Sequence, residues 1–95
     1  MAYVPNRAIN TYSSNTTISN LDSVVFVNAA SAPVQITLPS SVIGKYFDIK
    51  KTDSSANVVT ITPPSGTIDG AANVTISIQY ASVTIIGDGS NFYIL

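Results

Sequence analysis

β-Branched aliphatic residues dominate the apolar part of this chain. Isoleucine and valine together number 22, whereas leucine occurs three times. Side chains branched at Cβ are stiff at χ1 and fit a pleated sheet better than a helix. No window sustains apolar residues at the i, i+3, i+4 spacing of an amphipathic helix. The sequence therefore predicts an all-β fold.

Several segments show the alternation that marks a strand with one buried face. In PVQITLP, Val34, Ile36 and Leu38 share one side, because successive side chains of a strand point to opposite faces. Prolines bracket this segment, as they do at strand ends. Strands recur at a spacing typical of small sandwiches and barrels, so we expect a small antiparallel β-sandwich or barrel-like knob. The predicted strands are 23–28, 33–39, 45–51, 57–63, 73–79, 82–87 and 91–95.

The two ends of the chain depart from this pattern in different ways. Residues 1–20 have scattered apolar residues without a clear period, and we expect an extended N-terminal arm there, followed by a β-rich globular domain over 21–95. The carboxyl end stays apolar to its last residue. Asp-Gly-Ser at 88–90 has turn chemistry, which predicts a hairpin that leads into the terminal segment NFYIL.

The predicted hairpin assigns a face to each residue near the carboxyl end. Phe92 and Ile94 fall on the core face, whereas Tyr93 and Leu95 fall on the opposite face together with Ile86. Exposure to water does not account for aliphatic residues on that face, whereas burial in a subunit interface does. Tyrosines on the arm would anchor it to a partner. The candidate interface residues are therefore Tyr3, Tyr12, Ile86, Tyr93 and Leu95.

Residue types that carry catalysis or bind metals are scarce. The chain has no histidine, cysteine or glutamate, and general acid–base catalysis needs two titratable groups in one pocket. Four of the five aspartates lie in turn contexts, where Asp is favoured by its local hydrogen bonding. The fifth, Asp48, lies in a predicted strand beside Lys50, where a charge pair explains it. We expect no catalytic, cofactor or metal site and no enzymatic activity.

Charged residues make up 9% of the chain, against about 25% in an average protein. Four basic residues are too few for a nucleic-acid-binding face. No apolar segment approaches the ~18 residues of a membrane span, and the N-terminus MAYVPNRAIN lacks the apolar core of a signal peptide. We therefore expect neither a nucleic-acid partner nor a membrane partner.

From Asp22 to Leu95 the chain resembles a small β module of bacteriophage virion proteins, found in tail fibres, tail spikes, head fibres and decoration proteins. The resemblance rests on the order of three stretches, DSVVFVNAASAPVQITLPSS, GKYFDIKKTDSSANVVTITPPSGTIDGAANVTI and YASVTIIGDGSNFYIL. The module often has Trp where this chain has Phe92. It implies a non-enzymatic, usually trimeric β knob on a virus particle. It transfers no catalytic residue and does not extend to residues 1–20.

Two positions on a virion fit this resemblance. The first is that of a capsid decoration or cement protein, a homotrimer that clamps capsomers by contact with the major capsid protein or another virion protein. The alternative is a tail-fibre or head-fibre tip that binds a receptor or glycan on the host surface. Met1 leads us to expect a complete small chain without a fibre shaft, which favours the first position. Either protein would belong to a virion assembled in the host cytoplasm.

Overall fold

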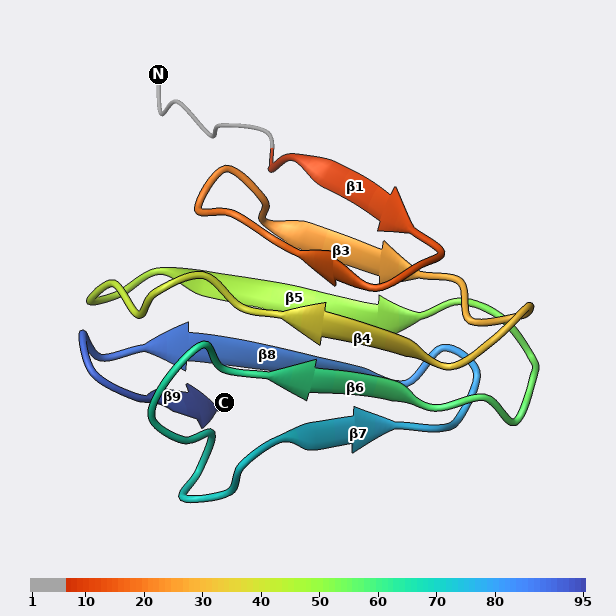
Figure 1. Cartoon of the computed structure of the whole chain (residues 1–95). Coiled ribbons are helices and arrows are strands. Elements are labelled where there is room, and N and C mark those ends of the chain that lie inside the picture. The colour runs from red at the N-terminus through yellow and green to blue at the C-terminus, as the bar shows by residue number, and fades with distance from the viewer. Residues whose placement is uncertain (1–6) are drawn as a thin grey trace.

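The computed structural model describes residues 7–95, which form nine strands in two facing sheets and no helix (Figure 1). Sheet A has the strand order β1-β3-β5-β8-β9, and sheet B has the order β2-β4-β6-β7. The described residues thus include no helix that could span a membrane. The strands are β1 (Ile9–Tyr12), β2 (Thr16–Thr17), β3 (Val24–Val27), β4 (Val34–Thr37), β5 (Tyr46–Lys51), β6 (Val59–Thr62), β7 (Val74–Ile76), β8 (Ser82–Gly87) and β9 (Phe92–Ile94).

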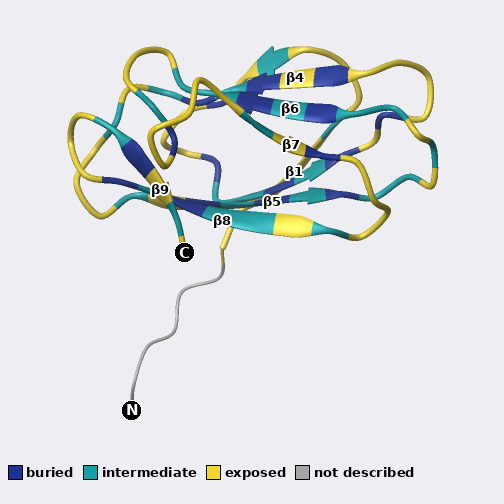
Figure 2. Cartoon of the chain, turned by 90° about the horizontal axis from the view of Figure 1, so that it is seen from below, coloured by how far each residue is buried: buried dark blue, intermediate teal, exposed yellow. Residues whose placement is uncertain are grey.

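The first six strands alternate between the two sheets. β1, β3 and β5 run parallel in sheet A, and β2, β4 and β6 run parallel in sheet B. The chain therefore winds as a flattened coil, in the right-handed sense usual for crossovers between parallel strands (Figures 1 and 2). After β6 the direction changes: β7 adds antiparallel to β6, β8 adds antiparallel to β5, and β9 adds antiparallel to β8.

The all-β prediction is confirmed, but the prediction of antiparallel pairing is wrong for part of the fold. Four of the seven strand pairs are parallel, so both sheets are mixed. Alternation of apolar and polar residues is typical of antiparallel sheets with one buried face. The parallel strands here show the same alternation because each sheet contacts the core on its inner face alone. Periodicity cannot separate these two cases.

The extended N-terminal arm is not supported. Within its described part, β1 pairs with β3 at one edge of sheet A, and β2 pairs with β4 at one edge of sheet B. Ile18 follows β2 and is buried. Both strands are short and mostly exposed, so their sequences lack the apolar alternation that marked the others. Edge position in the sheets explains why sequence periodicity missed them.

The core fills the space between the two sheets, and the buried residues lie on their facing sides (Figure 2). Each of the seven predicted strands is present. The predicted strand 73–79 is shorter in the structure, because β7 ends at Ile76 and a turn follows in which the Ala81 N–H donates to the Ile78 carbonyl. The buried apolar residues are Ile18, Val25, Val27, Ala29, Val34, Ile36, Leu38, Phe47, Ile49, Val59, Ile61, Ile68, Ile76, Ile85 and Phe92.

Two of the predicted aspartate turns shape the carboxyl-terminal end of the fold. Asp69 and Gly70 have positive φ (51° and 80°) between the bridged residues Ile68 and Ala71, as a two-residue hairpin turn requires. Asp88 begins the β8–β9 connection, where its carboxylate accepts the N–H groups of the two residues that precede β9. These N–H groups hold the pKa of Asp88 below its ordinary value. The predicted β8–β9 hairpin is therefore confirmed.

Candidate functional site

The outer face of sheet A, which points away from sheet B, carries aligned apolar side chains. The register places Ile86 between Tyr46 of β5 and Tyr93 of β9, so these three side chains form one row across three strands. A neighbouring row begins at Ile9 and Val24 of the two parallel strands. We call the whole set the apolar outer face; it consists of Ile9, Val24, Phe26, Tyr46, Ile86, Tyr93 and Leu95.

These side chains are accessible in the single chain. Leu95 is 76% exposed and Ile9 is 60% exposed, and the rings of Tyr46 and Tyr93 are close to half exposed. Val24, Phe26 and Ile86 are partly covered by their neighbours. The carboxyl-terminal residue does not fray from the sheet, because the Leu95 N–H donates to the Thr84 carbonyl at 2.9 Å. The face is therefore a regular, strand-supported surface rather than a set of loose side chains.

A paired charge cluster lies within this face. Asp48 forms an ion pair with Arg7 and accepts a hydrogen bond from the Thr84 hydroxyl. The Arg7 guanidinium also lies 4.6 Å from the centre of the Tyr46 ring and donates to the Ser23 carbonyl. Partial burial raises the pKa of Asp48, but the hydrogen bonds from Thr84 and Arg7 and the Arg7 charge outweigh it and lower the pKa below its ordinary value. The partner of Asp48 is thus Arg7, where the sequence suggested Lys50.

The outer face of sheet B has a different chemistry. Its outward side chains are threonine and glutamine in register across the four strands, with no charge and no large apolar group. Threonine favours strands and its hydroxyl hydrogen-bonds to water, so this face can remain exposed to solvent. The outward residues of sheet B are Thr17, Gln35, Thr37, Thr60, Thr62 and Thr75. The two layers therefore present one apolar face and one hydroxyl-rich face.

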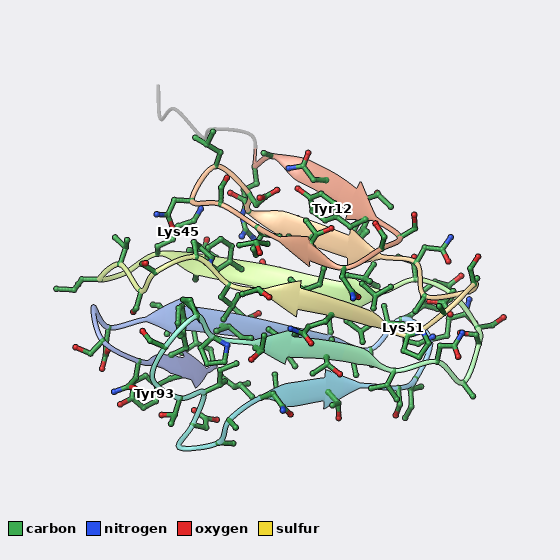
Figure 3. All side chains as sticks on the ribbon, in the orientation of Figure 1. Tyr12, Lys45, Lys51 and Tyr93 are labelled. Carbon is green, nitrogen blue, oxygen red and sulfur yellow. The ribbon has the colours of Figure 1, made fainter. Side chains whose placement is uncertain are left out.

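The predicted interface residues do not all lie together. Ile86, Tyr93 and Leu95 share the apolar outer face, on the side that the hairpin predicted. Tyr12 lies at the other end of sheet A and points inward (Figure 3), where its hydroxyl donates to the Asp22 carboxylate at 2.8 Å. That hydrogen bond, with partial burial and the Asp22 charge, raises the pKa of Tyr12. Tyr3 lies outside the described residues.

Sequence reasoning missed four members of the apolar outer face, namely Ile9, Val24, Phe26 and Tyr46. The sequence does contain a usable signal for Val24 and Phe26. The segment SVVFVN is almost continuously apolar, and a strand of that kind has apolar side chains on both faces. Ile9 lies in a strand that the sequence did not reveal, and Tyr46 alternates with polar neighbours. Only the strand register shows that all four share a face with Leu95.

Tyr80 lies in the β7–β8 loop, with 61% of its surface exposed. Its φ of 67° is in the left-handed region, which costs an L-residue about 1–2 kcal/mol. Two hydrogen bonds hold it there: the Tyr80 N–H donates to the Lys51 carbonyl at 2.7 Å, and the Lys50 ammonium donates to the Tyr80 carbonyl at 2.8 Å. The fold therefore fixes an aromatic ring in solvent.

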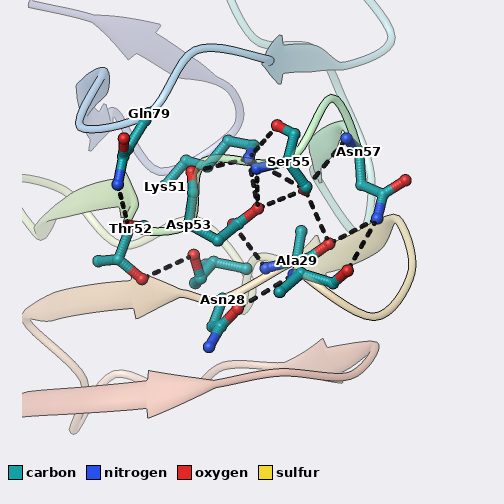
Figure 4. Close-up of polar contacts among 10 residues, drawn as sticks. Asn28, Ala29, Lys51, Thr52, Asp53, Ser55, Asn57 and Gln79 are labelled. Carbon is teal, nitrogen blue, oxygen red and sulfur yellow. Dashed lines mark hydrogen bonds and ion pairs between the residues drawn. The ribbon is translucent and has the colours of Figure 1, made fainter.

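A second polar cluster, which sequence reasoning missed, closes one end of the core. Lys51 lies on the inner side of β5 with no exposed surface (Figures 3 and 4). Its ammonium donates to the Asp53 carboxylate at 2.7 Å and to the Ser55 carbonyl at 2.9 Å. The same carboxylate accepts the Ala29 N–H at 2.7 Å, and the Asn57 amide donates to the Ala29 carbonyl. The cluster thus ties the loop after β3 to the loop after β5.

This cluster is structural in character because its hydrogen-bonding capacity is used. Burial raises the pKa of Asp53, but Lys51, the Ser55 hydroxyl and the N–H groups of Ala29 and Ser55 outweigh it and hold the pKa far below its ordinary value. Among residues 7–95, no buried side-chain nitrogen or oxygen lacks a hydrogen-bond partner. In the same range, no three acidic side chains gather to form a metal-binding group. The cluster therefore leaves no group directed at a ligand.

Neither a protein-family model nor a curated protein matches the chain. An apolar, strand-supported face is suited to binding another protein surface by burial of area. The chemistry available there is contact and ion pairing: Arg7 and Asp48 pair with each other, and Lys50, which lies on the same face beside Phe26, donates to the Tyr80 carbonyl.

Proposed function

We propose that the protein is a non-enzymatic structural protein of a bacteriophage virion, a capsid decoration or cement protein that assembles as a homotrimer and clamps capsomers. The observation that supports this proposal is the contrast between the outer faces of the two sheets. One carries seven apolar side chains beside the Arg7–Asp48 pair and Lys50, and the other consists of threonine and glutamine. A protein that stays monomeric in water gains no stability from an apolar outer face.

The apolar outer face favours burial in an assembly on energetic grounds. Covering apolar surface stabilises by about 25 cal/mol for each Å² removed from water. Large contiguous apolar patches on soluble proteins usually mark interaction sites. Copies of the chain that contact one another through this face would meet each of these conditions.

The capsid position is supported by the sequence resemblance to virion modules and by the low charge of the chain. Nine per cent charged residues leave little repulsion between copies that pack side by side. In the proposed trimer the apolar outer face lies between subunits, and the hydroxyl-rich face of sheet B remains in water. Contacts with the major capsid protein or another virion protein would then involve the loops and strand edges at the rim of the trimer.

Binding to capsids tests this function. Phage particles stripped of decoration proteins would be mixed with increasing amounts of the purified chain and sedimented. We expect saturable binding in a fixed ratio to the capsid protein, and the unbound fraction should consist of assemblies whose chain number is a multiple of three. The polar variant Tyr93→Ser, altered on the apolar outer face, should bind less, whereas Thr60→Ser on sheet B serves as the matched control. A stable monomer that ignores capsids would contradict the proposal.

A second candidate function is supported by Tyr80. An aromatic ring fixed in solvent beside a lysine is suited to stacking on a sugar, so the chain could instead be a fibre tip that binds a host glycan or receptor. Here the wild-type protein should bind saturably to host cells or isolated lipopolysaccharide, and Tyr80→Ala should lose at least about tenfold in affinity. Equal binding of the two proteins would remove this alternative.

A further inference from the structure

The two edges of sheet A are protected to different degrees against the addition of another strand. At the β9 edge, three of the four backbone groups of Phe92 and Ile94 that point away from β8 are hydrogen-bonded. The Phe92 N–H donates to the Thr67 carbonyl at 2.9 Å, and the Phe92 carbonyl accepts a hydrogen bond from the Asp69 N–H at 3.0 Å. The next outward N–H, that of Ile94, donates to the Asp69 carboxylate at 3.1 Å. The hairpin that contains Asp69 therefore closes this edge.

The β1 edge lacks such a closure. The Val24 N–H donates to the Ala8 carbonyl and the Asn28 N–H donates to the Tyr12 carbonyl, each at 2.9 Å, so the even-numbered residues of β1 face β3. Because backbone groups alternate in direction along a strand, those of Ile9 and Thr11 point away from the sheet. No residue from 7 to 95 hydrogen-bonds to these groups.

The sequence of β1 also lacks the devices that discourage edge pairing. Natural edge strands are guarded by charge, by proline, by a bulge or by a covering segment. The strand INTY contains neither charge nor proline, and its four residues pair in unbroken register with β3. Ile9 is 60% exposed beside this edge. One edge of sheet A is therefore closed, whereas the described residues leave the other open and regular.

We propose that β1 pairs with β1 of a second copy of this chain, antiparallel, about a twofold axis through Asn10. In this register Ile9 of each copy lies opposite Thr11 of the other, and the four outward N–H groups meet the four outward carbonyls. An antiparallel twofold contact uses the same patch on both copies and closes on itself. The strand suits a copy of itself because INTY is uncharged and the outward groups of Ile9 and Thr11 are complementary.

Continuity with the apolar outer face favours a second copy over an unrelated strand. Ile9 belongs to that face, so pairing at β1 joins the apolar outer faces of two copies into one continuous surface. The contact is distinct from the threefold contact proposed above and does not depend on a virion role. Combined with a trimer it predicts a hexamer, and without the trimer it predicts a dimer. Assemblies should therefore contain an even number of chains.

Amide hydrogen exchange on the full chain tests the pairing residue by residue. In dilute solution the amides of Asn10 and Tyr12 should exchange slowly, because they bond to β3, whereas those of Ile9 and Thr11 should exchange fast. In concentrated solution the exchange of Ile9 and Thr11 should slow by at least about tenfold. Exchange at these two positions that does not depend on protein concentration would overturn the proposal.

Two variants test the same contact by sedimentation velocity. Thr11→Pro removes an N–H that β3 does not use, and proline is tolerated at strand edges. Ile9→Lys introduces a guarding charge at an exposed position. Each should halve the number of chains in the assembly at a concentration where the wild type is fully paired. Ile78→Lys is the matched control, at 71% exposure in the β7–β8 loop, and should leave the number unchanged. Assembly of Ile9→Lys as in the wild type would overturn the pairing even if Thr11→Pro misfolded.

Discussion

Replacement of Lys51 by methionine tests whether the buried ion pair holds the end of the core together. Methionine keeps most of the aliphatic stem of Lys51 but removes the ammonium, which contacts the Asp53 carboxylate and the Ser55 carbonyl. The Asp53 side chain is 6% exposed and would remain ionised with its cation missing. The N–H groups of Ala29 and Ser55 would still bond to it.

The expected loss is large compared with the stability of a small domain. Removal of one partner of a buried ion pair costs about 3–5 kcal/mol, and the remaining N–H donors to Asp53 place the loss near 3 kcal/mol. Domains of this size have roughly 5–15 kcal/mol of total stability. At about 4–8 °C for each kcal/mol, the melting temperature should fall by roughly 12–24 °C.

Urea unfolding followed by circular dichroism measures this loss. The slope of the transition should stay constant while its midpoint falls, because the substitution changes stability rather than the area exposed on unfolding. Lys50→Met is the matched control, since Lys50 lies one residue earlier on the opposite face of β5 and donates to the Tyr80 carbonyl near the surface. It should cost less than about 1 kcal/mol. Equal losses in the two variants would refute the reasoning.

Three further predictions concern the core, the pH dependence and a close packing contact. Ile36→Ala, in a fully buried position, should lose about 2–5 kcal/mol by urea unfolding, whereas Ile78→Ala, in an exposed one, should lose less than about 0.5 kcal/mol. Because the pKa of Asp53 is lowered on folding, its contribution to stability is complete above the unfolded pKa of about 3.9 and is lost as the pH falls toward the folded value. Thermal melts should show this decline in acid, and Asp53→Asn should flatten it; equal acid sensitivity of the two proteins would contradict the assignment. Gly87→Ala would place a Cβ 2.7 Å from the Ser41 hydroxyl, so it should lose roughly 1–3 kcal/mol by the same unfolding assay, and unchanged stability would show that the loop moves aside.

The strands and the core residues were largely predictable from the sequence, and the pairing of strands was not. Alternation placed Val34, Ile36 and Leu38 on a common face, and all three are buried. Alternation reports which side of a strand is buried but contains no information about its neighbours. The parallel coil formed by β1 to β6 depends on crossovers between sheets, and no local pattern distinguishes these from hairpins. The strand β1 was missed for a different reason, because it lies exposed at a sheet edge and its sequence lacks apolar alternation.

The candidate site was predictable only where one hairpin determined it. Ile86, Tyr93 and Leu95 could be placed on one face because a turn at 88–91 fixes how β8 pairs with β9. Val24 and Ile9 reach the same face through parallel pairing between residues that lie far apart in sequence. The burial of Lys51 could not be predicted, because a lysine at the end of a strand is usually interpreted as solvated. Its burial depends on Asp53 folding back over it.

The most direct test of the central claim, that the apolar outer face is buried between copies, is the mass of the protein in solution. Sedimentation velocity should find the wild type in assemblies whose chain number is a multiple of three. Leu95→Ser alters a side chain that is 76% exposed in the single chain, so it should leave the urea midpoint unchanged and shift the protein toward smaller species. Ile78→Ser, at similar exposure away from this face, should assemble as the wild type does. A monomeric wild type, or a Leu95→Ser variant that assembles as the wild type does, would contradict the account.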